Sequence, residues 1–394
     1  MEIRKVYLDN SATTFVGSDV LREMLPTFNA SFGNPNSPNS YGREAHALVE
    51  LARERVAKSI GAKASEIYFT SGGTESNNWA IKGIAHKLKE KGNHIITSAI
   101  EHDSILNACK QLEGEGFKVT YLRPDENGII SIADLMHNIG KDTILISIMS
   151  ANNELGTIQN IQALAHTAQE KGIVFHTDAT QAYGAINFHV NDMCIDMMSI
   201  SSHKIYGPKG VGALYIREGI ELEPLLNGGE QENGMRGGTS NVPGIVGFGK
   251  ACEIATRDMS INAHKIRSLK EHFIKKLTAE VPNFKINGHN YQRLQGVLSI
   301  TFEGVDGEAL TTLLDMKGIA VSTGSACNSG SHKPSYVLTA IGLDTIEAKS
   351  TIRISIGKSN TKEELDYVVL TIKDAVENLR AISPIRIKKK KLED

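Results

Sequence analysis

The chain has 394 residues, and its 43 Lys and Arg nearly balance its 45 Asp and Glu, which gives a formal net charge of -2. This balance argues against binding to nucleic acid or to an acidic membrane through overall charge. No apolar run approaches the ~20 residues that span a bilayer, and the first 14 residues lack the apolar centre of a signal peptide. The four cysteines are widely spaced without a C-x-x-C pair, so we expect neither a metal site nor a disulfide framework, and a reducing, cytoplasmic setting.

From about residue 66, short β-rich runs alternate with amphipathic segments of helical length. The predicted strands are Glu66–Thr70, His94–Ser98, Val119–Leu122, Thr143–Met149, Ile173–Thr177, Asp196–Ser201 and Val211–Ile216, with helices such as Ser76–Lys91 and Ile161–Lys171 between them. This alternation predicts an α/β fold with a largely parallel sheet that helices cover on both faces. Ligands of such sheets bind beyond the carboxyl ends of the strands.

The last third of the chain has a different pattern. The alternation weakens after Met235–Gly249, and a long helix is predicted at Ile261–Glu280. Further strands are predicted at Leu298–Phe302, Ala320–Ser322 and Ile352–Ile356, with a final helix at Lys362–Leu379. These elements predict a separate, smaller α+β unit.

The first predicted strand is followed by S-G-G-T-E-S-N-N, a Gly-Gly turn that leads into a helix. Gly72 and Gly73 let backbone N–H groups approach an anion, the helix N-terminus adds a favourable dipole, and Thr74 adds a hydroxyl group. The segment suits a phosphate group, although an ordinary capped helix has the same pattern.

Polar residues also follow the second and fourth strands. His102 stands in E-H-D-S and Asn153 in N-N-E-L-G. Taken alone, His102 is more often a hydrogen-bonded structural histidine, and Asn153 could either bind a carboxylate or close a turn.

An acid and an amine follow the fifth and sixth strands. Asp178 comes directly after an apolar run, where a carboxylate is costly to bury without a partner. Lys204, in S-S-H-K-I-Y-G, is either an ion-pair partner or an amine nucleophile. Pyridoxal phosphate requires a lysine for its Schiff base, an acid for its ring nitrogen and a phosphate cup, so the sequence favours this cofactor.

Nine segments occur in the order typical of one enzyme family: Y-L-D-N-S-A-T-T, F-G-N-P-N-S, S-G-G-T-E-S-N-N, E-H-D-S, N-N-E-L-G, D-A-T-Q, S-S-H-K-I-Y-G-P-K-G, R-G-G-T and S-T-G-S-A-C-N-S-G-S. Through these segments, over about residues 6–380, the chain resembles the cysteine desulfurases of the NifS/IscS type. These are fold-type I pyridoxal-phosphate enzymes of the aminotransferase class V superfamily. The resemblance implies a large cofactor-binding domain at 15–258, with a mostly parallel seven-stranded sheet between helices. It also implies a smaller α+β domain formed by 1–14 and 259–394.

The resemblance implies a role for each matching position. At the cofactor, Lys204 would form the Schiff base, Asp178 would pair with the ring nitrogen, and Gln181 would contact the ring hydroxyl oxygen. His102 would stack on the ring and assist proton transfer. The phosphate would be bound by Gly73, Thr74, Ser201 and His203. Asn153, also beside the cofactor, and Arg353 would hold the substrate carboxylate. Thr239 would reach the phosphate of the partner subunit, so the resemblance implies a homodimer.

Cys327 stands in S-T-G-S-A-C-N-S-G-S, a run of turn-forming residues without apolar periodicity, which predicts a mobile surface loop. The resemblance implies that the thiolate of Cys327 attacks the sulfur of L-cysteine, leaving alanine and a persulfide. The sulfur would then pass to an acceptor protein for iron–sulfur cluster assembly, tRNA thiolation or sulfur insertion into a cofactor.

Other readings of the sequence are less well supported. G-I-V-G-F-G-K-A at 244–251 lacks the hydroxyl residue and the preceding strand of a nucleotide-binding loop, and G-P-K-G-V-G leads into a strand, so it is no dinucleotide fingerprint. Within pyridoxal-phosphate chemistry, the alternatives are a selenocysteine lyase or another class V enzyme such as an aminotransferase. A sulfur carrier without enzymatic activity is disfavoured by the presence of Lys204, Asp178 and His102.

Overall fold

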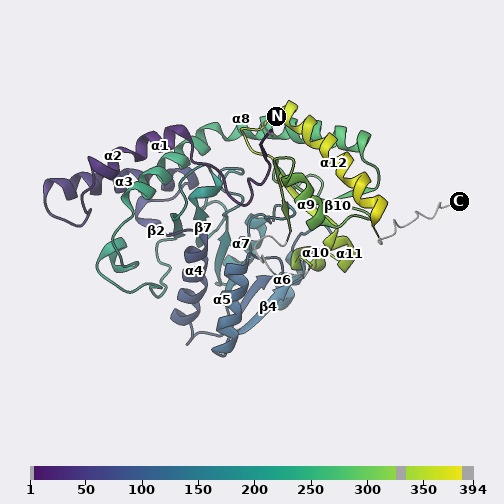
Figure 1. Ribbon diagram of the computed structural model, residues 1–394. Coiled ribbons are helices and arrows are strands. Elements are labelled where there is room, and N and C mark those ends of the chain that lie inside the picture. The colour runs from purple at the N-terminus through teal and green to yellow at the C-terminus, as the bar shows by residue number, and fades with distance from the viewer. Residues whose placement is uncertain (1–3, 325–333, 384–394) are drawn as a thin grey trace.

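The computed structural model describes residues 4–324 and 334–383. Cys327 lies outside these residues. Figure 1 shows a large sheet with helices packed around it. A smaller unit lies at one end of the molecule, and α12 (Lys362–Ile382) covers this unit. Within the described ranges, no helix combines the length and the apolar character that crossing a membrane requires.

The large sheet has seven strands in the order β2-β8-β7-β6-β5-β3-β4. Their bounds are β2 Ile67–Thr70, β3 His94–Ser98, β4 Lys118–Leu122, β5 Thr143–Ser147, β6 Val174–Asp178, β7 Met197–Ser201 and β8 Gly212–Ile216. Neighbouring strands are parallel except at β8, which is antiparallel to both β7 and β2. The predicted sheet is therefore confirmed, and each predicted strand lies within two residues of its observed bounds.

Helices bury both faces of this sheet, which explains why its strands other than the edge strand β4 are rich in apolar residues and almost entirely buried. Successive residues of a strand point to opposite faces: Ile95 and Leu145 pack with α4 and α5, whereas Ile96 and Ile146 pack with the helices opposite. The helices are α1 Ser18–Met24, α2 Pro26–Asn29, α3 Ser40–Ile60, α4 Gly73–Lys87, α5 Asp103–Gly114, α6 Ile132–Asn138, α7 Ile161–Glu170 and α8 Val242–Glu280.

Helix α8 is much longer than predicted, because the sequence indicated a helix only from Ile261. Its first part contains closely spaced glycines, which lower helix propensity and concealed it in the sequence. The structure shows why they are there: a Cβ atom at Gly247 would lie 2.5 Å from Met24 Sδ, and one at Gly249 would lie 2.6 Å from Ala52 Cα. The glycines let α8 pack closely against α1 and α3.

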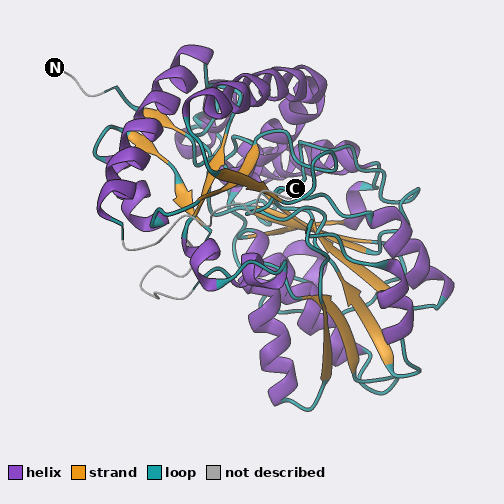
Figure 2. Ribbon diagram, turned by 90° about the vertical axis from the view of Figure 1, so that its right-hand side faces the viewer, coloured by secondary structure: helices purple, strands orange, loops and turns teal. Residues whose placement is uncertain are grey.

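The smaller unit contains a four-stranded sheet in the order β12-β13-β10-β9 (Figure 2). Its elements are β9 Phe284–Asn287, β10 Val297–Phe302, α9 Gly307–Asp315, β11 Ile319–Ala320, β12 Ser322–Thr323, α10 Tyr336–Ala340, α11 Thr345–Lys349 and β13 Thr351–Ser355. The strands at β10 and β13 and the final helix are confirmed. The single strand predicted at Ala320–Ser322 is wrong, because β11 and β12 belong to different sheets, and β9 was not predicted.

The N-terminal segment joins this smaller unit. Strand β1 (Val6–Tyr7) pairs in parallel with β11, and Val6 and Leu8 lie in the same apolar core as Leu269 and Phe273 of α8. The first part of α8 packs in the core of the large sheet instead. The domain division at 258/259 falls inside this continuous helix and stays a prediction.

Candidate active site

A cavity of about 290 Å³ lies at the carboxyl ends of the central strands of the large sheet. It is lined by ten residues that the sequence singled out: Gly73, Thr74, His102, Asn153, Asp178, Gln181, Ser201, His203, Lys204 and Arg353. Two predicted residues are not among them. Thr239 is exposed and does not line the cavity, and Cys327 lies outside the described residues.

The turn between β2 and α4 places a helix N-terminus at the cavity. Gly72 has φ 148° and ψ -177°, a conformation that is accessible to glycine. A Cβ atom at Gly73, the first residue of α4, would lie 2.8 Å from Thr180 Oγ1. Because the first N–H groups of a helix have no partner within it, and no side chain among the described residues caps α4 at Gly72, this end of α4 is suited to a phosphate group.

The residues after β7 bring a neutral imidazole to the cavity. Ser202–Lys204 forms one short helical turn, and His203 Nδ1 lies 3.1 Å from Thr13 Oγ1. Burial, together with the positive charges of Lys204 and Lys209, lowers the pKa of His203 to about 4. At neutral pH the ring is therefore uncharged and has one N–H group that can donate a hydrogen bond.

The N-terminal segment forms one wall of the cavity. Lys204 Nζ donates hydrogen bonds to the carbonyl oxygens of Ser11 and Ala12, the latter at 2.8 Å. Gln181 Nε2 donates to the carbonyl oxygen of Ser11 at 2.9 Å. These backbone acceptors hold the amine of Lys204 and the amide of Gln181 at the same wall.

Hydrogen bonds between side chains connect Asp178 to His102. Asn77 Nδ2 donates to Asp178 Oδ2 at 2.7 Å and to Ser104 Oγ at 2.8 Å. The Thr180 N–H donates to Asp178 Oδ1 at 2.8 Å. His102 Nδ1 lies 2.8 Å from Ser104 Oγ and accepts from the Ser104 N–H at 3.2 Å. Because Nδ1 is an acceptor, the neutral His102 ring carries its proton on Nε2.

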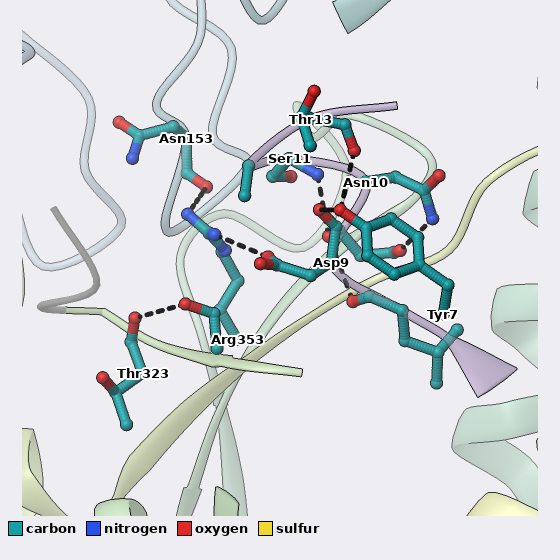
Figure 3. A network of polar contacts seen from close by, with 12 residues as sticks. Tyr7, Asp9, Asn10, Ser11, Thr13, Asn153, Thr323 and Arg353 are labelled. Atoms are coloured by element: carbon teal, nitrogen blue, oxygen red, sulfur yellow. Dashed lines mark hydrogen bonds and ion pairs between the residues drawn. The ribbon is translucent and has the colours of Figure 1, made fainter. Parts of the chain in front are cut away.

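Figure 3 shows Arg353, on β13, between Asp9 and Asn153. Its Nη2 pairs with Asp9 Oδ1 at 2.8 Å, and its Nη1 donates to the carbonyl oxygen of Asn153 at 3.3 Å. Its Nε is buried and has no hydrogen-bond partner among the described residues. A guanidinium group whose side chain is only 4% exposed, and which lines the cavity, is suited to binding a carboxylate.

The structure also separates the two roles that the sequence left open for Asn153. The turn is closed by its neighbour Asn152, whose Oδ1 accepts from the N–H groups of Glu154 and Leu155, both at 2.9 Å. Asn153 lines the cavity instead. Its position is compatible with a ligand-binding role.

Several polar groups in the cavity wall are suited to a bound molecule. Asn77 Oδ1 and Thr180 Oγ1 are buried without a hydrogen-bond partner in the part of the chain that the structure describes, and both residues line the cavity. Buried polar atoms normally have partners. A phosphate site at α4, a buried acid at Asp178 and the amine of Lys204 complete a set of groups that fits pyridoxal phosphate.

No role was predicted from the sequence for Asn77, Ser104, Thr180 or Asp9. A signal existed for Asn77, which stands four residues after Gly73 and so shares its face of α4. The other three are ordinary polar residues: Ser104 is near a helix start, Thr180 is in a turn, and Asp9 forms an isolated β-bridge with Ser355. Only their partners in space identify them.

Comparisons with known proteins agree with this geometry. Residues 6–368 match the aminotransferase class-V family. The chain is 49% identical over 384 residues to a cysteine desulfurase IscS of Methanosarcina thermophila, covering 98% of this chain and 95% of the relative. A solved structure of a NifS-like protein superposes with a TM-score of 0.90 at 40% identity, over 95% of this chain and all of that one. A structure of SspA in complex with cysteine superposes with a TM-score of 0.80 at 43% identity, over 90% of this chain and 99% of that one.

Proposed function

The chain belongs to the aminotransferase class-V family, and we propose that it is a pyridoxal-phosphate-dependent cysteine desulfurase that carries sulfur as a persulfide on Cys327. One observation carries the proposal: an amine, a buried acid and a buried guanidinium group, from Lys204, Asp178 and Arg353, line the same cavity. The names of similar full-length proteins support the reaction.

The large sheet would hold the cofactor. Lys204 would bind pyridoxal phosphate through its amine, Asp178 would pair with the ring nitrogen, and Gln181 with the ring hydroxyl oxygen. The phosphate would lie at the N-terminus of α4, with Gly73, Thr74, Ser201 and His203 around it. When bound, the cofactor supplies an electron sink for the negative charge that develops at the substrate α-carbon.

The substrate carboxylate would bind at Arg353 and Asn153. The ion pair with Asp9 orients the guanidinium group, and its buried Nε would supply a donor for the carboxylate. Lys204 would take the α-proton. His102, with a proton on Nε2, would stack on the ring and assist proton transfer.

The thiolate of Cys327 attacks the sulfur atom of L-cysteine. A new S–S bond forms and the substrate C–S bond breaks. The electron pair of the broken bond stays with carbon, which takes a proton and becomes the methyl group of L-alanine. The sulfur remains as a persulfide on Cys327, and no external oxidant is consumed.

Covalent geometry supports this role for Cys327. Gly324, the last described residue before it, is three residues away, and three residues of chain span at most about 11 Å. Ser322 of β12 pairs directly with Arg353 of β13. The segment that carries Cys327 therefore begins beside the strand of the residue proposed to bind the substrate carboxylate.

A homodimer would complete the site, with Thr239 reaching the phosphate bound by the partner subunit. Thr239 is exposed and does not contribute to its own cavity. The segment from α1 to α3 exposes large apolar side chains, namely Leu25, Phe28, Phe32 and Tyr41. In Figure 1 this region and the loop before α8 lie at the same end of the molecule, away from α12. Exposed apolar groups of this kind mark interaction surfaces.

The persulfide would pass by thiol exchange to an acceptor protein, such as an iron–sulfur scaffold or a tRNA-thiolation enzyme. We place the reaction in the cytoplasm, because the three described cysteines, Cys109, Cys194 and Cys252, are all free and thiols persist in reducing compartments.

The test is alanine and sulfide production from L-cysteine by the purified holoenzyme and by Cys327→Ala. The variant should retain the absorbance of the lysine-bound cofactor and lose turnover. Unchanged turnover of the variant would remove the role of Cys327 and favour another class V reaction. A higher kcat/KM with selenocysteine would favour a selenocysteine lyase, and a purified protein without cofactor absorbance would favour a non-enzymatic sulfur carrier.

A further inference from the structure

Glu154 is a buried carboxyl group for which the proposed reaction has no use. It follows Asn153 in the turn after β5 and is only 5% exposed. Its Oε2 accepts a hydrogen bond from Ser335 Oγ at 2.6 Å. A carboxyl group buried to this extent is costly unless it has hydrogen-bond partners, and Ser335 supplies one.

Gly324 and Ser335, which lie on either side of Cys327 in the sequence, both lie next to Oε2 of Glu154. Gly324 is the last described residue before Cys327, and Ser335 is the second described residue after it. A Cβ atom at Gly324 would lie 2.4 Å from Glu154 Oε2 and 3.2 Å from Ser335 Cβ. Gly324 and Ser335 are therefore neighbours in space, and the Glu154 carboxyl group contacts both.

Helix α10 holds Ser335 firmly in this position. Tyr336, the first residue of α10, donates from its hydroxyl group to the carbonyl oxygen of Glu101 at 2.6 Å. Leu338 belongs to an apolar cluster with Ile100 and Leu155. These contacts attach α10 to the two segments that follow β3 and β5, which also carry cavity-lining residues.

The charges around Glu154 connect it to the proposed substrate site. Burial raises the pKa of Glu154 to about 7, the positive charge of Arg353 opposes this rise, and the negative charge of Asp103 adds to it. The carboxyl group can accept the Ser335 hydrogen bond in either protonation state. The Ser335 hydrogen bond also opposes the rise of the pKa, so it is stronger with the charged form, but protonation does not remove the acceptor oxygen.

We propose that Glu154 is a positioning residue for sulfur transfer, because its carboxyl group fixes the two sides of the Cys327 segment beside Arg353. These sides are Gly324 and Ser335. The inference rests on the proposed desulfurase function and specifies what determines the point from which Cys327 acts. Binding of the substrate carboxylate does not require Glu154, whereas transfer of the sulfur does.

The first test compares Glu154→Ala with Glu154→Gln in the full-length holoenzyme. For Glu154→Ala we expect kcat to fall roughly 10- to 100-fold, the scale of a reacting group misplaced by about 1 Å, with KM for L-cysteine little changed. Glu154→Gln should keep most of kcat, because its amide oxygen still accepts from Ser335. A second readout is the rate at which iodoacetamide alkylates Cys327, followed by mass spectrometry, which should change in Glu154→Ala and not in Glu154→Gln.

The second test uses the steric contact. Gly324→Ala should impair sulfur transfer, because the new methyl group meets Glu154 Oε2. In the double variant Gly324→Ala/Glu154→Ala the methyl group has room, so the two effects should be less than additive. Gly114→Ala is the matched control, since a Cβ atom there meets nothing within 4 Å.

The outcomes separate this inference from the proposed function. If the wild-type enzyme produced no alanine from L-cysteine, the proposed function would fail. Wild-type values of kcat and alkylation rate in Glu154→Ala would overturn the positioning role, as would equal losses in Glu154→Ala and Glu154→Gln. Strictly additive effects in the double variant would show that Gly324 and Glu154 act independently, which also contradicts it.

Discussion

Replacement of Asn77 by alanine tests how the acid of the site is supported. In the structure Asn77 Nδ2 donates to Asp178 Oδ2 at 2.7 Å in a buried setting, and the Thr180 N–H donates to the other oxygen at 2.8 Å. The substitution removes the first of these. A hydrogen bond to a charged group is worth about 1.5–3 kcal/mol. Without it, the Asp178 carboxylate is held less firmly toward the cofactor ring, and its proposed pairing with the ring nitrogen is weaker by up to this amount. We therefore expect kcat to fall about 10- to 150-fold, the factor to which this energy corresponds.

The assay is alanine formation by the holoenzyme over a range of L-cysteine concentrations. KM should change little, because Arg353 is unaltered. Asn78→Ala is the matched control: it changes the neighbouring residue on α4, whose Nδ2 donates to the Thr74 carbonyl oxygen at 3.0 Å and makes no described contact with Asp178. Equal kcat values for the two variants would refute the reasoning, and a melting temperature lowered only in Asn77→Ala would assign the loss to folding instead.

Three further predictions concern Arg353, Glu101 and Gly249. Arg353→Lys keeps a positive charge near Asp9 but loses the planar fork, so KM for L-cysteine should rise about tenfold, as expected for the loss of one hydrogen bond to a charged group; an unchanged KM would place the carboxylate elsewhere. Burial raises the pKa of Glu101 from 4.5 to about 8, so the folded protein keeps a proton that the unfolded chain releases. This contribution to the free energy of unfolding is fully present below pH 4.5 and is lost as the pH rises to about 8. Glu101→Gln should reduce this pH dependence of the free energy of unfolding, measured by urea titrations at several pH values. An unaltered pH dependence would contradict the prediction. Gly249→Ala adds a methyl group 2.6 Å from Ala52 Cα, so the free energy of unfolding should fall by about 1–3 kcal/mol; a stability equal to wild type would show that α8 and α3 separate without cost.

The sequence predicted the large sheet well for a physical reason. Strands buried on both faces are rich in apolar residues and end at polar or glycine residues, so their ends can be recognised in the sequence. Asp178 and Lys204 stand directly at or after such ends. Once the sheet is predicted, the carboxyl ends of its parallel strands bring these side chains together without any further information.

Features that depend on packing between distant segments could not be predicted in this way. Asn77 looks like an interior residue of an amphipathic helix, and its partner Asp178 is 101 residues away. The glycines of α8 lower its helical signal, and their purpose is visible only when α1 and α3 are in place. Lys204 donates to backbone carbonyl groups of Ser11 and Ala12, which have no side-chain signature at all.

The site draws its parts from two cores, and this division has a consequence for the reaction. The groups proposed to bind the cofactor follow strands of the large sheet, whereas Arg353 and the attachment of Cys327 come from the smaller unit. Within that unit, Ser322 and Arg353 are paired across β12 and β13, and Gly324 lies two residues further along. A displacement of the smaller unit would therefore move the carboxylate-binding group and the root of the thiol-bearing segment together. Under the proposed function, a substrate on Arg353 would move together with the described start of the Cys327 segment, and Glu154 adds a contact from the large unit at Gly324.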